Sequence, residues 1–348
     1  MTNIEAIDIV IPWVDGSDKA WYKKYQEYKP SSSNSEVASS RNRYNDWGTL
    51  MYLFRGIEKF LPWIRKVHFI TEGHLPDWLN VDCERLNIVK HSDYFKDDNV
   101  LPTFNANPIL LNLAWLDDLS ENFILFNDDT FVLDFCEPTR FFNDNLPVDF
   151  FSQSIRRDNF IYNTLRPKNK LNAQMLQNNI DNLNSIIDKS RLDFFSEMFM
   201  SKNYSIKARG KNLFFNLISP RRFTWIDIYH QPQAHLKSTY RELWSILPKV
   251  MEETVSSKFR CSTDITEYLC RFYNLVRNKF TPKMHYDHLS IAVFTYQDMQ
   301  NIDLHNIKFL CVSDGDGISE SDFNKCKLEM TQKLDALLPE ISSFEKER

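Results

Sequence analysis

Short apolar runs alternate with segments of helical spacing through the first 150 residues, and this alternation limits the fold more than any other feature. The runs are rich in β-branched and aromatic residues, and their lengths suit strands. They span residues 7–14, 67–71, 86–90 and 123–126. Helical spacing covers 48–61 and 107–116. Strands separated by helices in this way predict an α/β fold with a mostly parallel sheet covered on both faces.

Prolines mark the ends of these two predicted helices. Pro62 ends the helix over 48–61, because proline cannot donate the backbone hydrogen bond that a further turn needs. Asn107 followed by Pro108 predicts the N-cap and the first residue of the next helix. Both helices carry apolar side chains on one face, as expected for helices that cover a sheet.

Helical patterns dominate the chain after residue 150. They cover 168–189, 236–255 and 319–338, and the last begins with the capping pair Ser319 and Asp322. A serine-rich stretch over 29–40 is typical of a surface loop. We therefore predict an α/β lobe over 1–150 and a mainly helical second lobe over 151–348 that returns to the core.

Charge and cysteine content exclude several classes of protein. The formal net charge of −5 argues against a dedicated nucleic-acid binder, which carries a basic face. The six cysteines form no Cys-x-x-Cys pair, so neither a zinc site nor a disulfide framework is expected. The N-terminus has no signal-peptide pattern, and no stretch approaches the roughly 18 apolar residues of a membrane span. We expect a cytoplasmic protein with at most peripheral membrane association.

Acidic clusters follow the first and the last of the predicted strands. Asp15, Gly16 and Asp18 come after the first strand, and Asp128 and Asp129 come after the last. In open α/β sheets, ligands bind beyond the carboxyl ends of the strands. The adjacent aspartates suit a hard divalent cation, Mg²⁺, that bridges the oxygens of a diphosphate. The alternative is a solvated turn at each position, since Asx and Asp-Gly turns commonly close strands.

Arginine and amide side chains lie near the starts of the two predicted helices or within them. Arg43 and Asp46 lie just before the helix over 48–61, and Arg55 lies within it. An arginine fork and a helix dipole favour the same anion, so this group suits a phosphate. The alternative is a set of surface arginines without a fixed partner. Asn105 has no evident structural role, whereas Asn107 is expected to be a helix cap.

Four ordered groups of segments extend over nearly the whole chain. They are IDIVIPWVDGSD (7–18); SRNRYNDWGTLMYLFRGIEKFLPWIRKVHFITEGHLPDWLN (40–80) with LPTFNANPILLNL and FILFNDDTF; YHQPQAHLKSTYRELW with KFRCSTDI (229–265); and KFLCVSDGD (308–316) with PEISSFEKE. Together they resemble the Stealth family, sugar-1-phosphate transferases of bacterial capsule and receptor polysaccharides that are related to N-acetylglucosamine-1-phosphotransferase. The resemblance implies a Rossmann-like, GT-A-like sheet flanked by helices.

The resemblance also implies a reaction. A hexose 1-phosphate would pass from a nucleotide sugar, expected to be a UDP-sugar, to a hydroxyl of a glycan or lipid-linked oligosaccharide acceptor. A phosphodiester would form and a nucleoside monophosphate would leave, as part of capsule or cell-surface polysaccharide synthesis. This chemistry needs charge neutralisation, a base and in-line positioning. The resemblance places it at the inner face of the cell membrane.

Each requirement has a candidate residue under this resemblance. His230 is the expected general base, because an imidazole titrates near neutral pH. Arg260 is expected to stabilise the phosphoryl oxygens, and Asp15 to orient its partners. A Mg²⁺ or Mn²⁺ ion is expected on the remaining carboxylates. The metal candidates are Asp128, Asp129 and Asp314; the donor- and phosphate-binding candidates are Trp13, Gly16, Asp18, Arg43, Asp46, Arg55, Asn105 and Asn107.

Two other functions stay open from the residues alone. A metal-dependent glycosyltransferase of the GT-A type would use Asp128 and Asp129 as a variant of a D-x-D metal site. It would take the same donor but form a glycosidic bond and release a nucleoside diphosphate. A non-catalytic polysaccharide-binding protein would instead line a groove with some of the aromatic residues, which make up 14% of the chain.

Overall fold

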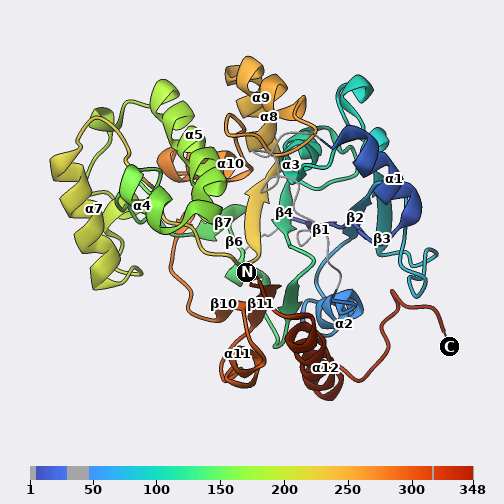
Figure 1. Ribbon diagram of the computed structural model, residues 1–348. Coiled ribbons are helices and arrows are strands. Elements are labelled where there is room, and N and C mark those ends of the chain that lie inside the picture. The colour runs from blue at the N-terminus through green and yellow to red at the C-terminus, as the bar shows by residue number, and fades with distance from the viewer. Residues whose placement is uncertain (1–4, 30–46, 316, 348) are drawn as a thin grey trace.

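A five-stranded, mostly parallel sheet forms the centre of the molecule in a computed structural model that describes residues 5–29, 47–315 and 317–347 (Figure 1). Its strand order is β3-β2-β1-β4-β8, and the first four strands are parallel. The fifth, β8, runs antiparallel to β4. The strands are β1 (Ile7–Pro12), β2 (Val67–Thr71), β3 (Leu86–Lys90), β4 (Asn122–Leu125) and β8 (Gln233–Leu236). The four strands expected from the sequence are confirmed, and so is the α/β class.

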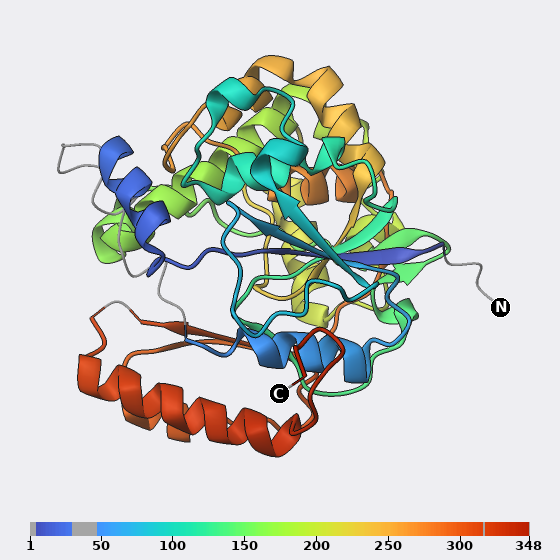
Figure 2. The same cartoon turned by 90° about the vertical axis from the view of Figure 1, so that its right-hand side faces the viewer.

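Helices cover both faces of this sheet, because alternate residues of each strand point to opposite sides. Ile9 and Ile11 of β1 pack in one hydrophobic core, and Val10 packs in the other. Figure 2 shows the sheet between a lower layer and an upper layer of helices. The lower layer holds α2 (Leu50–Phe60) and α12 (Glu320–Leu337); the upper layer holds α3 (Ala106–Leu111), α8 (Lys237–Ile246), α9 (Pro248–Val255) and α10 (Tyr268–Val276).

Two smaller sheets extend the central one. In the first, β11 pairs in parallel with β10 and antiparallel with β5, against α2 and α12. Gly56 of α2 is required there, since an added Cβ would lie 2.4 Å from the carbonyl oxygen of Val132 in β5. The strands are β5 (Thr130–Val132), β10 (His288–Val293) and β11 (Phe309–Asp314), and in the second small sheet β6 (Phe142–Asn143), β7 (Leu146–Asp149) and β9 (Thr281–Pro282).

The remaining helices lie mainly between residues 150 and 230, at the left of Figure 1. They include the helix expected over 168–189, which is observed as α5. None of the helices in the described ranges has both the length and the apolar character needed to cross a bilayer. The helices are α4 (Phe160–Leu165), α5 (Lys170–Ile186), α6 (Glu197–Met200) and α7 (Ile206–Ile218), with α1 (Lys19–Tyr28) and α11 (Tyr296–Gln300) elsewhere. Short 3₁₀ turns occupy His91–Asp93, Asp98–Val100, Asn112–Trp115, Pro138–Arg140, Pro167–Asn169 and Lys189–Arg191.

Helix boundaries confirm one capping prediction, correct another, and divide one expected helix into two. Ser319 caps α12 and accepts a hydrogen bond from the Asp322 amide at 3.0 Å, as expected. Asn105, rather than Asn107, is the N-cap of α3 and accepts from the Asn107 amide at 3.2 Å. The helix expected over 236–255 is two helices, because Pro248 begins α9 and removes the backbone donor that continuity would need.

Arg55 joins α2 to the C-terminal segment. Its Nε and Nη2 atoms donate to the two carboxylate oxygens of Glu345, each at 2.8 Å, and Nη1 donates to the Leu338 carbonyl at 2.9 Å. The two side chains are only 6% and 7% exposed. The phosphate-binding role expected for Arg55 is therefore corrected, because all three nitrogen atoms of its guanidinium donate within this buried structural contact.

Removing one partner of this buried pair should loosen the C-terminal segment. We expect Glu345→Gln to cost on the order of 3 kcal/mol, because it leaves the Arg55 charge buried without a counter-charge. The amides of Asn80 and Lys346, which bond the carbonyls of Phe344 and Trp78, should exchange hydrogen faster. Hydrogen exchange and urea unfolding measure both effects.

Lys66→Ala is the matched control for this substitution. It breaks an ion pair of 2.7 Å with Asp118 in which both partners are at least one-third exposed. Such exposed pairs contribute about 1 kcal/mol or less. Equal stability losses for Glu345→Gln and Lys66→Ala would contradict the role given to the buried pair.

Candidate active site

A cavity of about 270 Å³ opens beyond the carboxyl ends of the parallel strands. The loop after β1 contributes Trp13, and the segment after β4 contributes Asn127, Asp128 and Asp129. Arg260 lines the same cavity from the polypeptide between α9 and α10. The structure thus gathers three of the charged residues singled out in the sequence around one space, although they are up to 132 residues apart.

Asp128 and Asp129 lie in the tight turn between β4 and β5. The Thr130 amide donates to the Asn127 carbonyl at 3.2 Å, and the Val312 amide of β11 donates to the Asp129 carbonyl at 3.2 Å. Because β4 ends at Leu125, neither aspartate is restricted to one face of the sheet, and both line the cavity. The sequence left open that these aspartates only form a turn. That turn is present, and it places both carboxylates at one cavity.

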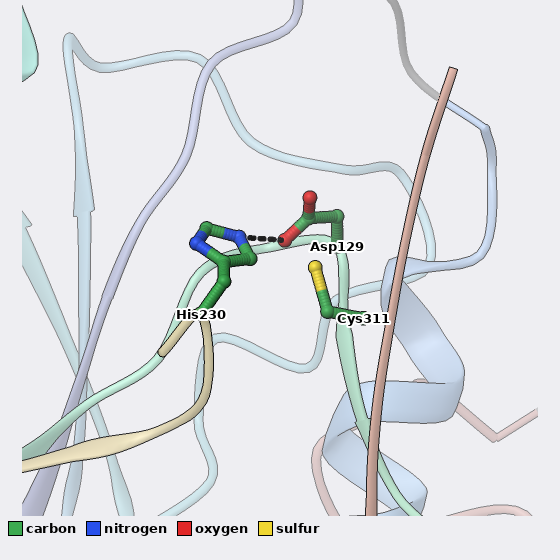
Figure 3. A group of neighbouring side chains, drawn as sticks. All are labelled: Asp129, His230 and Cys311. Atoms are coloured by element: carbon green, nitrogen blue, oxygen red, sulfur yellow. Dashed lines mark ion pairs between the residues drawn. The ribbon is translucent and has the colours of Figure 1, made fainter. Parts of the chain in front are cut away.

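His230 approaches this turn from the loop that precedes β8. Its Nε2 atom lies 3.0 Å from Nδ2 of Asn127 and 3.9 Å from Oδ1 of Asp129. Figure 3 shows the His230 ring facing the Asp129 carboxylate, with Cys311 of β11 beside them. The imidazole is 46% exposed, so it is open to a solute from outside. The nearby Asp129 carboxylate raises the pKa of His230 above its ordinary value, and the charge of Glu267 adds to this.

The Asp128–Asp129 turn suits a hard cation. Oδ1 of Asp129 is buried and has no hydrogen-bond partner among the described residues, which is an unfavourable position for a carboxylate oxygen without a cation. Mg²⁺ prefers such oxygen ligands, and Asp128 supplies a second carboxylate at the same cavity. The ligand set therefore fits Mg²⁺ or Mn²⁺.

Cys311 and His230 could add a sulfur and a nitrogen atom to the same group. One ligand atom each of Asp129, His230 and Cys311 lies within 4.8 Å of the others. Burial and the adjacent Asp129 charge raise the pKa of the Cys311 thiol, so the protonated form is favoured there. Thiol sulfur is also a soft ligand, so a hard cation such as Mg²⁺ would prefer the carboxylate oxygens of this group.

Arg260 is held by neighbours on two elements. Its Nη1 atom lies 3.5 Å from Oδ1 of Asn172 in α5. The next residue, Cys261, donates its amide to the Asp264 carboxylate at 2.9 Å, and Asn105 donates its Nδ2 to the same carboxylate at 2.8 Å. Burial raises the pKa of Asp264. Asn105 therefore both lines the cavity and fixes the segment that carries Arg260.

Asn107 also helps to hold the Asp264 segment next to Arg260, but it does not line the cavity. Its side chain is buried, and its Nδ2 atom lies 3.4 Å from the sulfur of Met175 and 3.5 Å from Oδ2 of Asp264. The donor-binding role expected for Asn107 is therefore replaced by a structural one. Its amide is occupied on the inner side of α3, away from the ligand space.

Asp15, Gly16 and Asp18, the other candidates in the loop after β1, do not line the cavity, and the contacts of the two aspartates are structural. Asp18 is the N-cap of α1 and accepts from the Trp21 amide at 2.7 Å. Asp15 accepts from the Ser17 amide at 2.8 Å, and its own amide donates to Nε2 of His74 at 2.8 Å. Neither these aspartates nor Gly16 lines the cavity, although Val14 does. The turn left open by the sequence accounts for the contacts of Asp15, and the helix cap accounts for that of Asp18.

Three candidates cannot be placed. Arg43 and Asp46 lie outside the described residues. Asp314 ends β11, but its side chain also lies outside the described part of the structure. Their roles in binding phosphate or metal stay predictions.

Glu72 and His91 line the cavity but were not among the candidate site residues. Each directly follows a strand, Glu72 after β2 and His91 after β3, so the rule that selected the loops after β1 and β4 also applies to them. Nδ1 of His91 lies 3.2 Å from Oε2 of Glu72, and Lys24 bonds Glu72 at 2.9 Å. Burial opposes the charge of Glu72, yet these two contacts lower its pKa to about 2.

Comparison with known proteins places the chain in a family. Residues 5–33 match the family model of Stealth protein conserved region 1, and residues 43–149 match that of conserved region 2. A capsular polysaccharide phosphotransferase, WcwK of Streptococcus pneumoniae, is 34% identical over 99% of this chain and 100% of its own length.

Two further relatives also match over nearly their whole length. The receptor polysaccharide phosphotransferase WefC of Streptococcus oralis is 30% identical over 97% of this chain and 99% of its own. The exopolysaccharide phosphotransferase cps2G of Lactiplantibacillus plantarum is 28% identical over 98% and 96%. These full-length similarities confirm the resemblance found in the four groups of segments: the chain belongs to the Stealth family.

Proposed function

We propose that this protein transfers a sugar 1-phosphate from a nucleotide sugar, expected to be a UDP-sugar, to a hydroxyl of a glycan during synthesis of a bacterial cell-surface polysaccharide. The proposal is supported by relatives that are polysaccharide phosphotransferases by name. The observation that carries it is the position of the His230 imidazole beside Asn127 and Asp129, two residues that line a cavity together with Arg260.

The charges around the cavity match what phosphoryl transfer requires. The transferred group carries negative charge on its equatorial oxygens, so catalysis depends on positioned cations more than on covalent chemistry. Arg260 would contact these oxygens, and its link to Asn172 reduces the freedom of the guanidinium. A Mg²⁺ or Mn²⁺ ion on Asp128 and Asp129 would neutralise charge on the pyrophosphate of the donor.

His230 would act as the general base. The acceptor oxygen would form a bond to the phosphorus of the sugar phosphate while its proton moves to the imidazole. The bond from that phosphorus to the bridging oxygen would break, and the nucleoside monophosphate would leave with the electron pair. The Asp129 carboxylate would stabilise the imidazolium formed, which is the same interaction that raises the pKa of His230.

The leaving group separates this proposal from a glycosyltransferase of the GT-A type. Such an enzyme could also use a metal at Asp128 and Asp129, but it attacks the sugar carbon and releases a nucleoside diphosphate. Products from UDP-sugars and glycan acceptors, analysed by mass spectrometry, distinguish the two. UMP with a phosphodiester product supports phosphotransfer, and UDP with a glycosidic product overturns it.

Replacing His230 should separate binding from turnover. We expect His230→Ala to lower kcat by about 10²-fold or more, because the acceptor hydroxyl loses its base. Donor affinity in calorimetry should change little, since the imidazole acts on the acceptor. The matched control is His305→Ala, which replaces an exposed histidine in the loop between α11 and β11 that does not line the cavity. Unchanged turnover in His230→Ala would show that this residue is not the base. If the wild type binds glycans but shows no turnover, it is a glycan-binding protein instead of an enzyme.

The raised pKa of His230 predicts the direction of a pH effect. In the metal-free protein, where the Asp129 carboxylate favours the imidazolium, the His230 ring should titrate above the ordinary histidine pKa of 6.5. Asp129→Asn should lower that pKa, because the neutral amide no longer favours the imidazolium. NMR titration of the His230 ring measures this without turnover. The control is Asp134→Asn, which replaces an exposed carboxylate after β5 and should leave the titration unchanged. A ring pKa that does not shift in Asp129→Asn would contradict the proposed coupling.

Metal binding can be measured independently of activity. We expect Mn²⁺, followed by electron paramagnetic resonance, to bind the wild type and to be displaced by Mg²⁺. Asp128→Asn and Asp129→Asn should each weaken binding, because each removes a charged oxygen ligand, and EDTA should abolish turnover. Asp134→Asn should bind as the wild type does. Full activity in EDTA, or a preference for Zn²⁺ that Cys311→Ser abolishes, would contradict a hard-cation site.

A further inference from the structure

Helix α7 has an unusual distribution of side chains. Its buried face is held by asparagines: Asn212 accepts from the Gln153 amide and donates to the carbonyls of Phe151 and Phe199, all at 2.8 Å, and Asn216 accepts from the Gln153 side chain at 2.8 Å. Its outward face is apolar. There the exposed fractions are 81% for Ile206, 55% for Phe214, 70% for Leu217 and 58% for Ile218.

Helix α4 also exposes large apolar side chains. Phe160 is 84% exposed, Ile161 is 69% exposed and Leu165 is 76% exposed. Asp227 connects the two segments, because it pairs with Lys211 of α7 at 2.8 Å and with Arg157, just before α4, at 3.9 Å. Figure 1 shows both helices at the left edge of the molecule, away from the central sheet. We call these seven exposed side chains of α4 and α7 the apolar patch.

The chain around the apolar patch is strongly basic. Residues 155–222 contain thirteen lysines and arginines against five acidic residues, a net charge of +8 within a chain whose total is −5. The exposed basic side chains include Arg166, Lys170, Lys202, Lys207, Arg221 and Arg222. Charge of one sign is therefore concentrated on the segment that also exposes the apolar side chains.

We propose that the apolar patch and the basic residues around it dock this protein on an anionic phospholipid bilayer. Isoleucine, leucine and phenylalanine side chains would enter the boundary between headgroups and acyl chains, while lysines and arginines contact the anionic headgroups. Helices with this division of side chains lie in the membrane surface and do not span it. The inference is independent of the reaction that the cavity catalyses.

Other occupants match the surface less well. A nucleic acid or an anionic polysaccharide would be attracted by the basic residues, but it gives no reason to expose several aliphatic side chains to water. A second copy of the chain would bring two copies of this basic segment together, which is unfavourable because like charges repel. An anionic bilayer satisfies both the charge and the apolar area.

Vesicle flotation tests the proposal with the full-length protein. We expect it to float with vesicles that contain phosphatidylglycerol, to remain largely unbound with phosphatidylcholine alone, and to bind less as salt increases. The triple variant Lys207→Ala/Arg221→Ala/Arg222→Ala should lower the partition coefficient by about 100-fold. Phe214→Ser/Leu217→Ser/Ile218→Ser should lower it at least about 10-fold.

Matched controls lie on other surfaces. Lys19→Ala/Lys23→Ala/Lys325→Ala removes three exposed lysines, and Leu328→Ser/Ile341→Ser removes two exposed apolar side chains; both should bind vesicles as the wild type does. Circular dichroism should be unchanged in all variants, because the substituted side chains face solvent. The proposal is overturned if the wild type ignores anionic vesicles, if the patch variants bind as the controls do, or if light scattering shows a dimer that the apolar triple variant dissociates while vesicle binding persists.

Discussion

The parallel alignment of β1, β2, β3 and β4 is the constraint on which the site depends. Parallel strands end at the same edge of a sheet, so the residues that follow them meet even when they are far apart in the chain. Trp13, Glu72, His91 and Asn127 each follow one of these strands, and all four line the same cavity. The antiparallel strand β8 then brings His230 to this edge from the second half of the chain, since the loop that carries the histidine leads directly into β8.

Opposite charges at this edge compensate for one another. Two adjacent aspartates are costly in a partly buried turn, because repulsion and the loss of water both oppose their charge. The neighbouring His230 imidazole, when it is protonated, offsets part of that cost, and Arg260 lines the same cavity. The supporting contacts come from a wider region: Asn105 and Asp264 fix the backbone next to Arg260, and Asn172 of α5 orients its guanidinium. The helical part after residue 150 thus contributes directly to the geometry of the cavity.

Local patterns in the sequence predicted the parts of this structure that local interactions determine. The four parallel strands, α2, α5 and the Ser319 cap follow from side-chain periodicity and capping chemistry, which operate over a few residues. The short strands β5, β10 and β11 carry little such signal, because they are stabilised by pairing with distant segments. The same reason explains why the prediction for Arg55 was wrong. Its partner Glu345 is 290 residues away, so the sequence alone could not show whether Arg55 forms a buried ion pair or binds a phosphate. Glu72 and His91 could have been found, since the rule applied after β1 and β4 holds for every strand of a parallel sheet.

The position of β8 has a consequence for how the protein is made. This strand covers the edge of β4, yet 107 residues separate the end of one from the start of the other. While the ribosome synthesises that intervening part, β4 presents unpaired backbone groups and the Phe123 side chain has not yet met its His235 neighbour. The central sheet therefore reaches its final form only after about two-thirds of the chain has emerged, and chaperones that shield exposed strand edges have a defined period in which to act.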